Sequence, residues 1–404
     1  MIPKGVWHQL GHNNQSMALE QLGEGNGIGV IISARDLKLT LAVERSNQYR
    51  ALGGRVLLDQ QFYIPDFKNK NLESYSTYEF RQSVTSLNQI DTAGLDALSD
   101  ALEQENRSLG AAAVLAPAVV YEANRPEIVD LNTKLFEAAK RAGDALGIPT
   151  LATVVLGSSV VVSQQSISSI LAHITALPCG GWYYTFEYAN DHRIPLDRSE
   201  VIRCGHACLT LATNASGRSV IHAYAGPMAI LSFGFGATGA GVGHTQTLWQ
   251  FNRARFAPSR SQGGPGEIQP RFFSTPLWGT IVCPEELLLL SDSLRSHVMV
   301  HSPFSQVLAN ASAIDAVDWG TWDAYKHLVY CVGKKAAEFA ALPTARRAAE
   351  AAIEHLTECI DTHSQMPVLL REESRCSHQV TWRSAMQELL GARKDDYDLL
   401  ELLG

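Results

Sequence analysis

The chain has 404 residues, of which 46% are hydrophobic and 18% are charged. This composition is typical of a folded protein, because disordered chains combine few apolar residues with a high net charge. A single core rarely grows beyond ~250–300 residues, so we expect one large domain with a smaller addition. The formal net charge of -8 provides no overall basic surface for coating nucleic acid, although a local basic groove is compatible with it.

Several kinds of segment are missing from the sequence. No stretch reaches the ~20 unbroken apolar residues of a membrane span, and residues 1–16 lack the charged and apolar regions of a secretory signal. The seven cysteines are scattered without a CxxC pair, so we expect reduced thiols in a cytoplasmic protein. Cys204 and Cys208 have a spacing that more often lines a core than binds a metal. No pattern predicts a cofactor or a metal site.

Short apolar runs alternate with amphipathic stretches along most of the chain. A strand-like run at 27–34 is followed by a helical stretch and a second strand at 55–59. The clearest helix, near 127–146, has apolar residues three and four positions apart. The expected strands are 27–34, 55–59, 111–117, 149–157, 181–188, 219–226 and 239–243, with 278–283 (WGTIVC) as the candidate for an eighth.

This alternation of strands and helices predicts parallel βα units. Such units build either a closed eight-stranded barrel or an open doubly wound sheet. The number of units matches the ~250-residue size of a barrel, so we predict an α/β, TIM-like (β/α)8 barrel over residues 1–283. Residues 284–404 contain no convincing strand, and we expect a helical C-terminal region that packs against the barrel or extends from it.

Functional residues of a barrel gather at the carboxyl ends of its strands. The run LLDQQFY places Asp59 at the end of the second expected strand, followed by Gln60, Gln61 and Tyr63. A carboxylate beside amide and phenol groups at this edge predicts a catalytic or substrate-binding cluster. The alternative is a loop anchor, because Asp often caps turns and helices.

Three further polar residues are candidates for catalysis by the same rule. Glu122 follows the third strand, where it would otherwise cap the next helix. Glu187 ends the aromatic fifth strand, where apolar neighbours would raise its pKa and suit it to acid or base chemistry. His222 lies in the sixth strand, and its alternative role is that of a hydrogen-bonded core residue.

The segment GFGATGAGVG matches GxGxxG in its letters, but no carboxylate follows where a dinucleotide site requires one. We expect Gly239, Gly241 and Gly243 to form the seventh strand and its exit, with His244 and Thr245 opening a helix. Backbone N–H groups at such a helix start bind phosphate, so this turn is a predicted anion site. The alternative is that the glycines only permit close packing.

The LLDQQFY run and the glycine-rich GATGAGVG strand are similar to strands of the tRNA-guanine transglycosylase barrels, over short stretches within 27–256. The resemblance implies a barrel that holds a purine-like base, with strand-end carboxylates that bind the base and attack the ribose. Asp59 alone matches the family's motif, as a base-recognition residue or catalytic carboxylate. Residues 60–62 replace the family's serine-glycine-glycine-phenylalanine run, and its zinc-binding cysteine cluster is absent.

Three functions follow from these observations. The leading hypothesis is a transglycosylase-like barrel acting on a nucleobase, nucleotide or nucleic acid, with Asp59 as central carboxylate and Glu122 and Glu187 as acid or base. The second is a non-catalytic subunit of a nucleic-acid-processing or antiviral complex. Its protein partner would bind the helical C-terminal region, where aromatic residues within 319–325 form a surface patch unless they belong to the core. The third is a barrel hydrolase or lyase acting on a phosphorylated metabolite.

Overall fold

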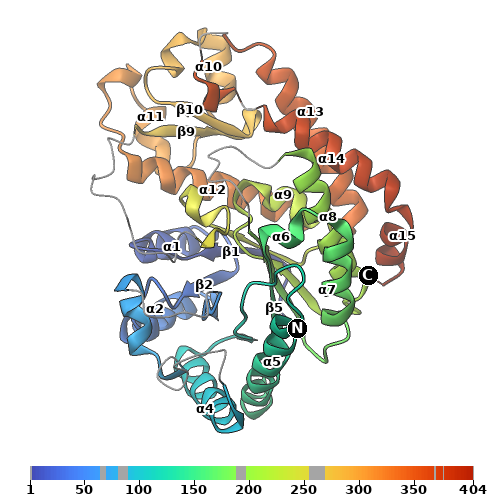
Figure 1. The fold of residues 1–404 in the computed structure, drawn as a ribbon. Helices are drawn as coiled ribbons and strands as arrows, with labels where there is room; N and C mark the ends of the chain where they lie inside the picture. Colours follow the sequence, from blue (N-terminus) through green and yellow to red (C-terminus); the bar gives the residue numbers. More distant parts are fainter. Residues whose placement is uncertain are drawn as a thin grey trace.

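Eight parallel strands form one sheet. This sheet lies at the centre of the molecule (Figure 1). This computed structural model describes residues 2–63, 70–80, 90–187, 197–253, 269–367, 370–375 and 377–403. The strands of the central sheet are β1 (Gly5–Gln9), β2 (Gly29–Ser33), β3 (Arg55–Asp59), β4 (Val114–Leu115), β5 (Thr150–Leu156), β6 (Gly181–Phe186), β7 (Ser219–His222) and β8 (Gly239–Val242).

Helices alternate with these strands and continue beyond the last of them. Those that accompany the barrel strands are α1 (Gln15–Gly23), α2 (Leu39–Ala51), α4 (Thr92–Leu109), α5 (Pro126–Leu146), α6 (Ser158–Val161), α7 (Gln164–Ile174), α8 (Arg198–Thr213) and α9 (Ala229–Gly234). Those that follow are α10 (Asp292–Val298), α11 (Gln306–Ala309), α12 (Thr321–Ala340), α13 (Ala345–His363), α14 (His378–Ala392) and α15 (Lys394–Leu403).

The sheet curls into a nearly closed barrel. Its strand order is β3-β2-β1-β8-β7-β6-β5-β4, so every strand lies beside its neighbours in sequence and β1 pairs with β8. At the seam between β3 and β4, the Ala112 amide donates to the Val56 carbonyl at 2.9 Å. This arrangement confirms the predicted TIM-like (β/α)8 barrel with a helical C-terminal region.

The barrel is filled by side chains, and glycines on two strands make room for the largest of them. Trp7 of β1 is fully buried. A Cβ added at Gly29 would lie 2.8 Å from the Trp7 ring, and one added at Gly239 would lie 3.0 Å from its indole nitrogen. The glycines therefore let one indole occupy the space of several side chains in this part of the interior.

Helix α5 agrees with its prediction. Pro126 occupies its first turn, and Gly147 ends it in the left-handed conformation at φ 67°. Ile128, Leu135 and Ala138 belong to its buried stripe. The apolar stripe whose 3.6-residue period predicted the helix is thus the face that packs on the barrel.

The eighth strand differs from its prediction. Residues 279–282 form β10 (Gly279–Val282), which pairs antiparallel with β9 (Arg271–Ser274) in a separate two-stranded sheet, so the assignment of WGTIVC to the barrel is wrong. The missing barrel strand is β1, in the sequence GVWHQ. The sequence did not predict this strand because two of its five residues are polar. His8 bonds outwards to the Asn26 carbonyl at 2.6 Å, and Gln9 is buried near the barrel centre.

The β9–β10 hairpin belongs to a small second core, seen above α12 in Figure 1. Helices α10 and α11 lie in the same region. Helix α12 contacts β9 on one side and β1 and α9 on the other, so it joins the small unit to the barrel. The buried apolar residues of this unit include Phe272, Leu277, Ile281, Leu287, Val298 and Trp319.

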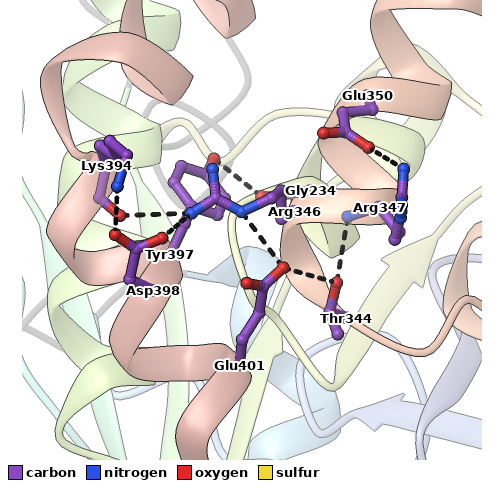
Figure 2. Close-up of polar contacts among 9 residues, drawn as sticks. All are labelled: Gly234, Thr344, Arg346, Arg347, Glu350, Lys394, Tyr397, Asp398 and Glu401. Carbon is purple, nitrogen blue, oxygen red and sulfur yellow. Dashed lines mark hydrogen bonds and ion pairs between the residues drawn. The ribbon is translucent and has the colours of Figure 1, made fainter.

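The last helix, α15, is fastened to α13 and to the end of α9 (Figure 2). Arg346 of α13 pairs with Asp398 and, at 3.1 Å, with Glu401. The hydroxyl of the fully buried Tyr397 donates to the Gly234 carbonyl at 2.9 Å. The C-terminal helices are therefore part of the same packed body as the barrel, and they share its main hydrophobic core.

Two general properties hold over the described ranges. There, no helix combines the length and the hydropathy that a membrane crossing requires. The cysteines of these ranges carry free thiols and are buried, namely Cys179, Cys204, Cys208, Cys283, Cys331 and Cys359.

Candidate functional site

The Asp59 carboxylate lies inside the carboxyl end of the barrel, with a relative exposure of 2%. The Tyr63 hydroxyl is 2.7 and 2.8 Å from its two oxygens. The Tyr183 hydroxyl, from β6, donates to Oδ2 at 2.9 Å, and the Gln61 backbone N–H donates to Oδ1 at 3.1 Å. The Tyr224 hydroxyl lies 3.4 Å from Oδ2. Residues from three strands or their loops therefore converge on one carboxylate.

Burial dominates the electrostatics of this carboxylate. Loss of solvent raises the pKa of Asp59 from 3.8 to about 6, although the hydrogen bonds from Tyr63, Tyr183 and Gln61 oppose the shift. The same burial, reinforced by the nearby carboxylate, raises the pKa of Tyr63 and Tyr183, which stay protonated as donors. Asp59 thus changes its charge close to neutral pH, as a general acid or base must.

Two residues of the cluster have strained backbones. Gln61 and Tyr224 adopt left-handed conformations at φ 56° and 54°, which cost about 1–3 kcal/mol for residues other than glycine. The Gln61 side-chain amide and the Tyr224 hydroxyl are 2.7 Å apart, and the Tyr75 hydroxyl donates to the Gln61 carbonyl at 2.9 Å. Strain of this kind is concentrated at functional sites, where surrounding contacts maintain it.

Two interior side chains retain polar atoms without a hydrogen-bond partner among the described residues. Gln9 ends β1 and is fully buried; its Oε1 is 3.5 Å from the Tyr183 hydroxyl, whereas its Nε2 is unpaired. Thr153 of β5 pairs in register with Tyr183, so it faces the same interior, and its hydroxyl is also unpaired. Such groups are costly unless satisfied, and both belong to the interior into which Tyr183 and Asp59 point.

An aromatic ring packs against the tyrosines of the cluster. Phe251 is 4.8 Å from the Tyr63 ring and 5.9 Å from the Tyr224 ring, between centroids. It also forms a parallel bridge with Glu187 at the end of β6. Phe251 therefore connects the Asp59 cluster to the charged residues that follow.

Those charged residues are two predicted acids held by one arginine. Arg253 Nε lies 2.6 Å from Glu187 Oε1, and the same guanidinium pairs with Glu122. The Ser158 amide donates to the other Glu187 oxygen at 3.2 Å. The structure thus brings Glu122 and Glu187 together, but as partners of a shared cation.

His222 lies apart from this site. Its Nδ1 is 2.7 Å from the Ser232 hydroxyl of α9, and its ring stacks on Tyr184 at 4.7 Å. Burial lowers its pKa to about 3, so it is neutral in the folded protein. These contacts place His222 between the barrel wall and a helix, in agreement with the alternative of a core histidine.

The expected helix at His244 is not formed. The chain instead makes a three-residue 3-10 turn, η4 (Gln246–Leu248). A Cβ added at Gly241 would lie 3.1 Å from Gln9 Oε1, and one at Gly243 would lie 2.2 Å from Leu248. Like Gly239, these glycines therefore permit close packing, and the anion site at this turn stays a prediction.

Three more predicted residues lie near this turn or beside the cluster. His244 Nδ1 accepts a hydrogen bond from the Asn14 amide at 3.0 Å, and Thr245 bonds the Thr247 hydroxyl at 2.9 Å. Gln60 is buried, and its Nε2 has no hydrogen-bond partner within the ranges that the structure describes. None of these contacts joins His244 or Thr245 to Asp59.

Of the predicted residues, Asp59, Gln61 and Tyr63 form one hydrogen-bonded cluster. The sequence interpretation missed Gln9, which ends a strand that it did not recognise. It also missed Ser33, the polar residue at the end of β2, and Tyr183 in the middle of β6. Applying the strand-end rule to GVWHQ and GVIIS was the available signal for the first two.

Comparison with known proteins assigns no family to the chain. No family profile and no curated protein matches it. Among solved structures, the 3-dehydroquinate dehydratase from Aquifex aeolicus VF5 is similar over 61% of this chain and 93% of that chain, at 13% identity and a TM-score of 0.35. This likeness carries no inference about activity.

Potential metal ligands are dispersed over the part of the chain that the structure describes. Within it, no three His, Cys, Asp or Glu side chains lie in positions that could hold a metal ion. The groups that the site itself presents are carboxyl, amide and hydroxyl groups of the Asp59 cluster.

Proposed function

We propose that the protein is a transglycosylase-like barrel enzyme that acts on the N-glycosidic bond of a nucleobase in a nucleotide or nucleic acid. The observation that carries the proposal is the position of Asp59, a buried strand-end carboxylate within the barrel on which the Tyr63 and Tyr183 hydroxyls converge. Catalytic groups of barrels occupy this position. The resemblance of LLDQQFY to the transglycosylase barrels supports the same assignment.

The hydrogen-bonding groups around Asp59 suit a nucleobase edge. A base such as guanine presents a ring N–H next to a carbonyl oxygen. Asp59 accepts from the N–H, and the unpaired Gln9 Nε2 donates to the carbonyl oxygen. The rings of Tyr63 and Phe251 provide aromatic faces beside the cluster. The ligand replaces some of the tyrosine hydrogen bonds that Asp59 now accepts.

Glu122 and Glu187 have a different part in the proposal. Both carboxylates pair with the single positive charge of Arg253, so either one acts as acid or base only when this guanidinium turns to a substrate phosphate or sugar. The ion-pair cluster is therefore a positioning element next to the base, and Asp59 is the carboxylate that contacts the substrate.

Base exchange tests the proposal. Purified protein is incubated with labelled guanine together with mixed tRNA, and in a second reaction together with duplex DNA. The label incorporated into the nucleic acid is then counted. The wild type is compared with Asp59→Asn and with Asp91→Asn. Asp91 caps α4 through the Gly94 amide at 2.8 Å, and asparagine is an equally good cap, so this variant matches the chemical change away from the site.

We expect label in the wild type and in Asp91→Asn, and a loss of at least ~100-fold in Asp59→Asn, as for removal of a general acid or base. Incorporation that persists in Asp59→Asn contradicts the role of Asp59. No incorporation in any variant supports instead the non-catalytic barrel subunit, whose partner is then sought by co-purification from the native host.

A further inference from the structure

A second carboxylate, Asp36, is connected to Asp59 through three buried side chains. Asp36 Oδ2 is 2.7 Å from the Ser33 hydroxyl, which is 2.7 Å from Gln61 Oε1. Gln61 Nε2 is 2.7 Å from the Tyr224 hydroxyl, which is 3.4 Å from Asp59 Oδ2. Ser33, Gln61 and Tyr224 are at most 2% exposed. We call these three residues the relay.

With both carboxylates ionised, the relay has fewer donor hydrogens than it has hydrogen-bond contacts. The Ser33 hydroxyl has one hydrogen but lies 2.7 Å from two oxygens, on Asp36 and on Gln61. If both carboxylates are ionised, one contact has no hydrogen. It is the Ser33–Gln61 contact at 2.7 Å with the amide as it is oriented, and the Tyr224–Asp59 contact at 3.4 Å with the amide turned over. A buried contact of that kind is unfavourable.

Two arrangements give every contact one hydrogen. In the first, protonated Asp36 donates to Ser33, Ser33 to the Gln61 oxygen, the Gln61 amide to Tyr224, and Tyr224 to ionised Asp59. In the second, the Gln61 amide is turned over, which its nearly isosteric ends allow. Protonated Asp59 then donates to Tyr224, Tyr224 to Gln61, Gln61 to Ser33, and Ser33 to ionised Asp36. The arrangements have equal numbers of protons and differ in which carboxyl group carries one.

We propose that Asp36 and Asp59 share a single proton through Ser33, Gln61 and Tyr224, so that Asp36 sets the protonation state of Asp59. Asp36 is a positioning residue in this scheme, because it acts on Asp59 through the relay. Arg35 pairs with Asp36 Oδ1 at 2.7 Å, which places a positive charge at the Asp36 end of the relay. The resting protein therefore holds the proton on Asp59, with the Gln61 oxygen turned to Tyr224.

The groups that face Asp59 agree with this assignment. Three phenols contact the Asp59 carboxyl group: Tyr63, which follows β3, Tyr183 of β6 and Tyr224 of the loop after β7. A fourth, Tyr75 of η1 (Lys70–Thr77), lies close enough for Asp59 and Tyr224 to raise its pKa. They offer hydrogen bonds but no positive charge. The charge that distinguishes the two arrangements is thus the one next to Asp36.

The test is a pH titration of Asp59 followed by ¹³C NMR. Protein is labelled at the aspartate carboxyl carbon, and the Asp59 signal is assigned as the one missing from Asp59→Asn. Wild type is compared with Asp36→Asn, Ser33→Ala and the control Tyr75→Phe. The control deletes a hydroxyl that bonds the Gln61 backbone but belongs to neither arrangement.

In the wild type we expect the Asp59 signal to move in two steps that it shares with a second aspartate, because coupled groups titrate as a pair. In Asp36→Asn the new side-chain amide donates to Ser33 as protonated Asp36 does, so this variant lowers the Asp59 midpoint by about 1 pH unit or more. Ser33→Ala leaves a single step, and Tyr75→Phe retains both.

A wild-type signal that moves in one step, or an Asp36→Asn curve that superimposes on it, overturns the shared proton. Should Asp36→Asn fail to fold, Ser33→Ala decides alone, since a retained second step contradicts the relay. The readout requires no substrate and is independent of the proposed reaction.

Discussion

At the scale of single residues, the molecule keeps a carboxyl group where its charge is unfavourable. Asp59 is buried among phenols, and its neutral form is favoured up to about pH 6. A structural anchor needs only its hydrogen bonds, which an amide or a hydroxyl also provides. A titratable group at the mouth of a barrel supports a chemical function.

This position makes stability depend on pH. The folded pKa of Asp59, about 6, lies above the ordinary value of 3.8, so its contribution to stability is complete below pH 3.8 and is lost as the pH rises through 6. The difference corresponds to ~3 kcal/mol. We expect Asp59→Asn to abolish this part of the decline, as measured by urea unfolding at about pH 4 and pH 7.5. An unchanged pH profile would show that Asp59 is ionised at little cost.

At the scale of elements, α4 provides a second buried acid. Glu105 is 1% exposed and accepts the Phe80 amide at 3.1 Å, and its Oε2 has no hydrogen-bond partner among the described residues. Burial raises its pKa from 4.5 to about 8. Its stabilising effect is therefore complete below pH 4.5 and lost as the pH rises through 8.

Glu105→Gln removes this ionisation while keeping the acceptor for Phe80. We predict that the variant is more stable than the wild type by ~1 kcal/mol or more at about pH 9 and not at about pH 5. Thermal unfolding at both pH values measures the difference. Equal effects at the two values would mean that packing, and not charge, is responsible.

The docking of α15 gives another prediction at this scale. Tyr397→Phe deletes the buried hydrogen bond to the Gly234 carbonyl and should lower the free energy of unfolding by ~1–3 kcal/mol, because the carbonyl loses its partner. Lys394→Ala, which removes an exposed ion pair with Asp398, is the control and should cost at most ~0.5 kcal/mol. Comparable losses in both would mean that the charged contacts of Figure 2 hold the helix.

The sequence predicted elements well where one local pattern decides them. Helix α5 has a complete apolar stripe, and Asp59, Gln61 and Tyr63 are neighbours in the chain at a recognisable strand end. Strand β1 was missed because His8 and Gln9 interrupt its apolar pattern.

Other parts of the site depend on barrel closure, which no local pattern contains. Tyr183 and Gln9 come from β6 and β1, far from Asp59 in sequence, and Arg253 reaches Glu187 and Glu122 only through the fold. The glycines of β8 were correctly assigned to a strand. The reason for glycine at these positions is tertiary, because side chains of other elements fill the space that a Cβ would occupy.

At the scale of the whole molecule, the barrel brings together Asp59, Gln9 and Tyr183 at one end, and the C-terminal helices stabilise the wall without reaching this cluster through any contact described above. We therefore expect a planar, polar ligand to bind in the barrel beside Asp59, and mutations in α13 to α15 to change stability with little effect on the ligand's affinity.

Calorimetric titration of the protein with free guanine tests that prediction most directly. Wild type and the Asp91→Asn control should bind alike, whereas Asp59→Asn and Gln9→Leu should each bind at least ~10-fold more weakly, the effect of losing ~1.4 kcal/mol. Binding of equal strength in all four proteins would place the ligand elsewhere and contradict the assignment of the Asp59 cluster as the functional site.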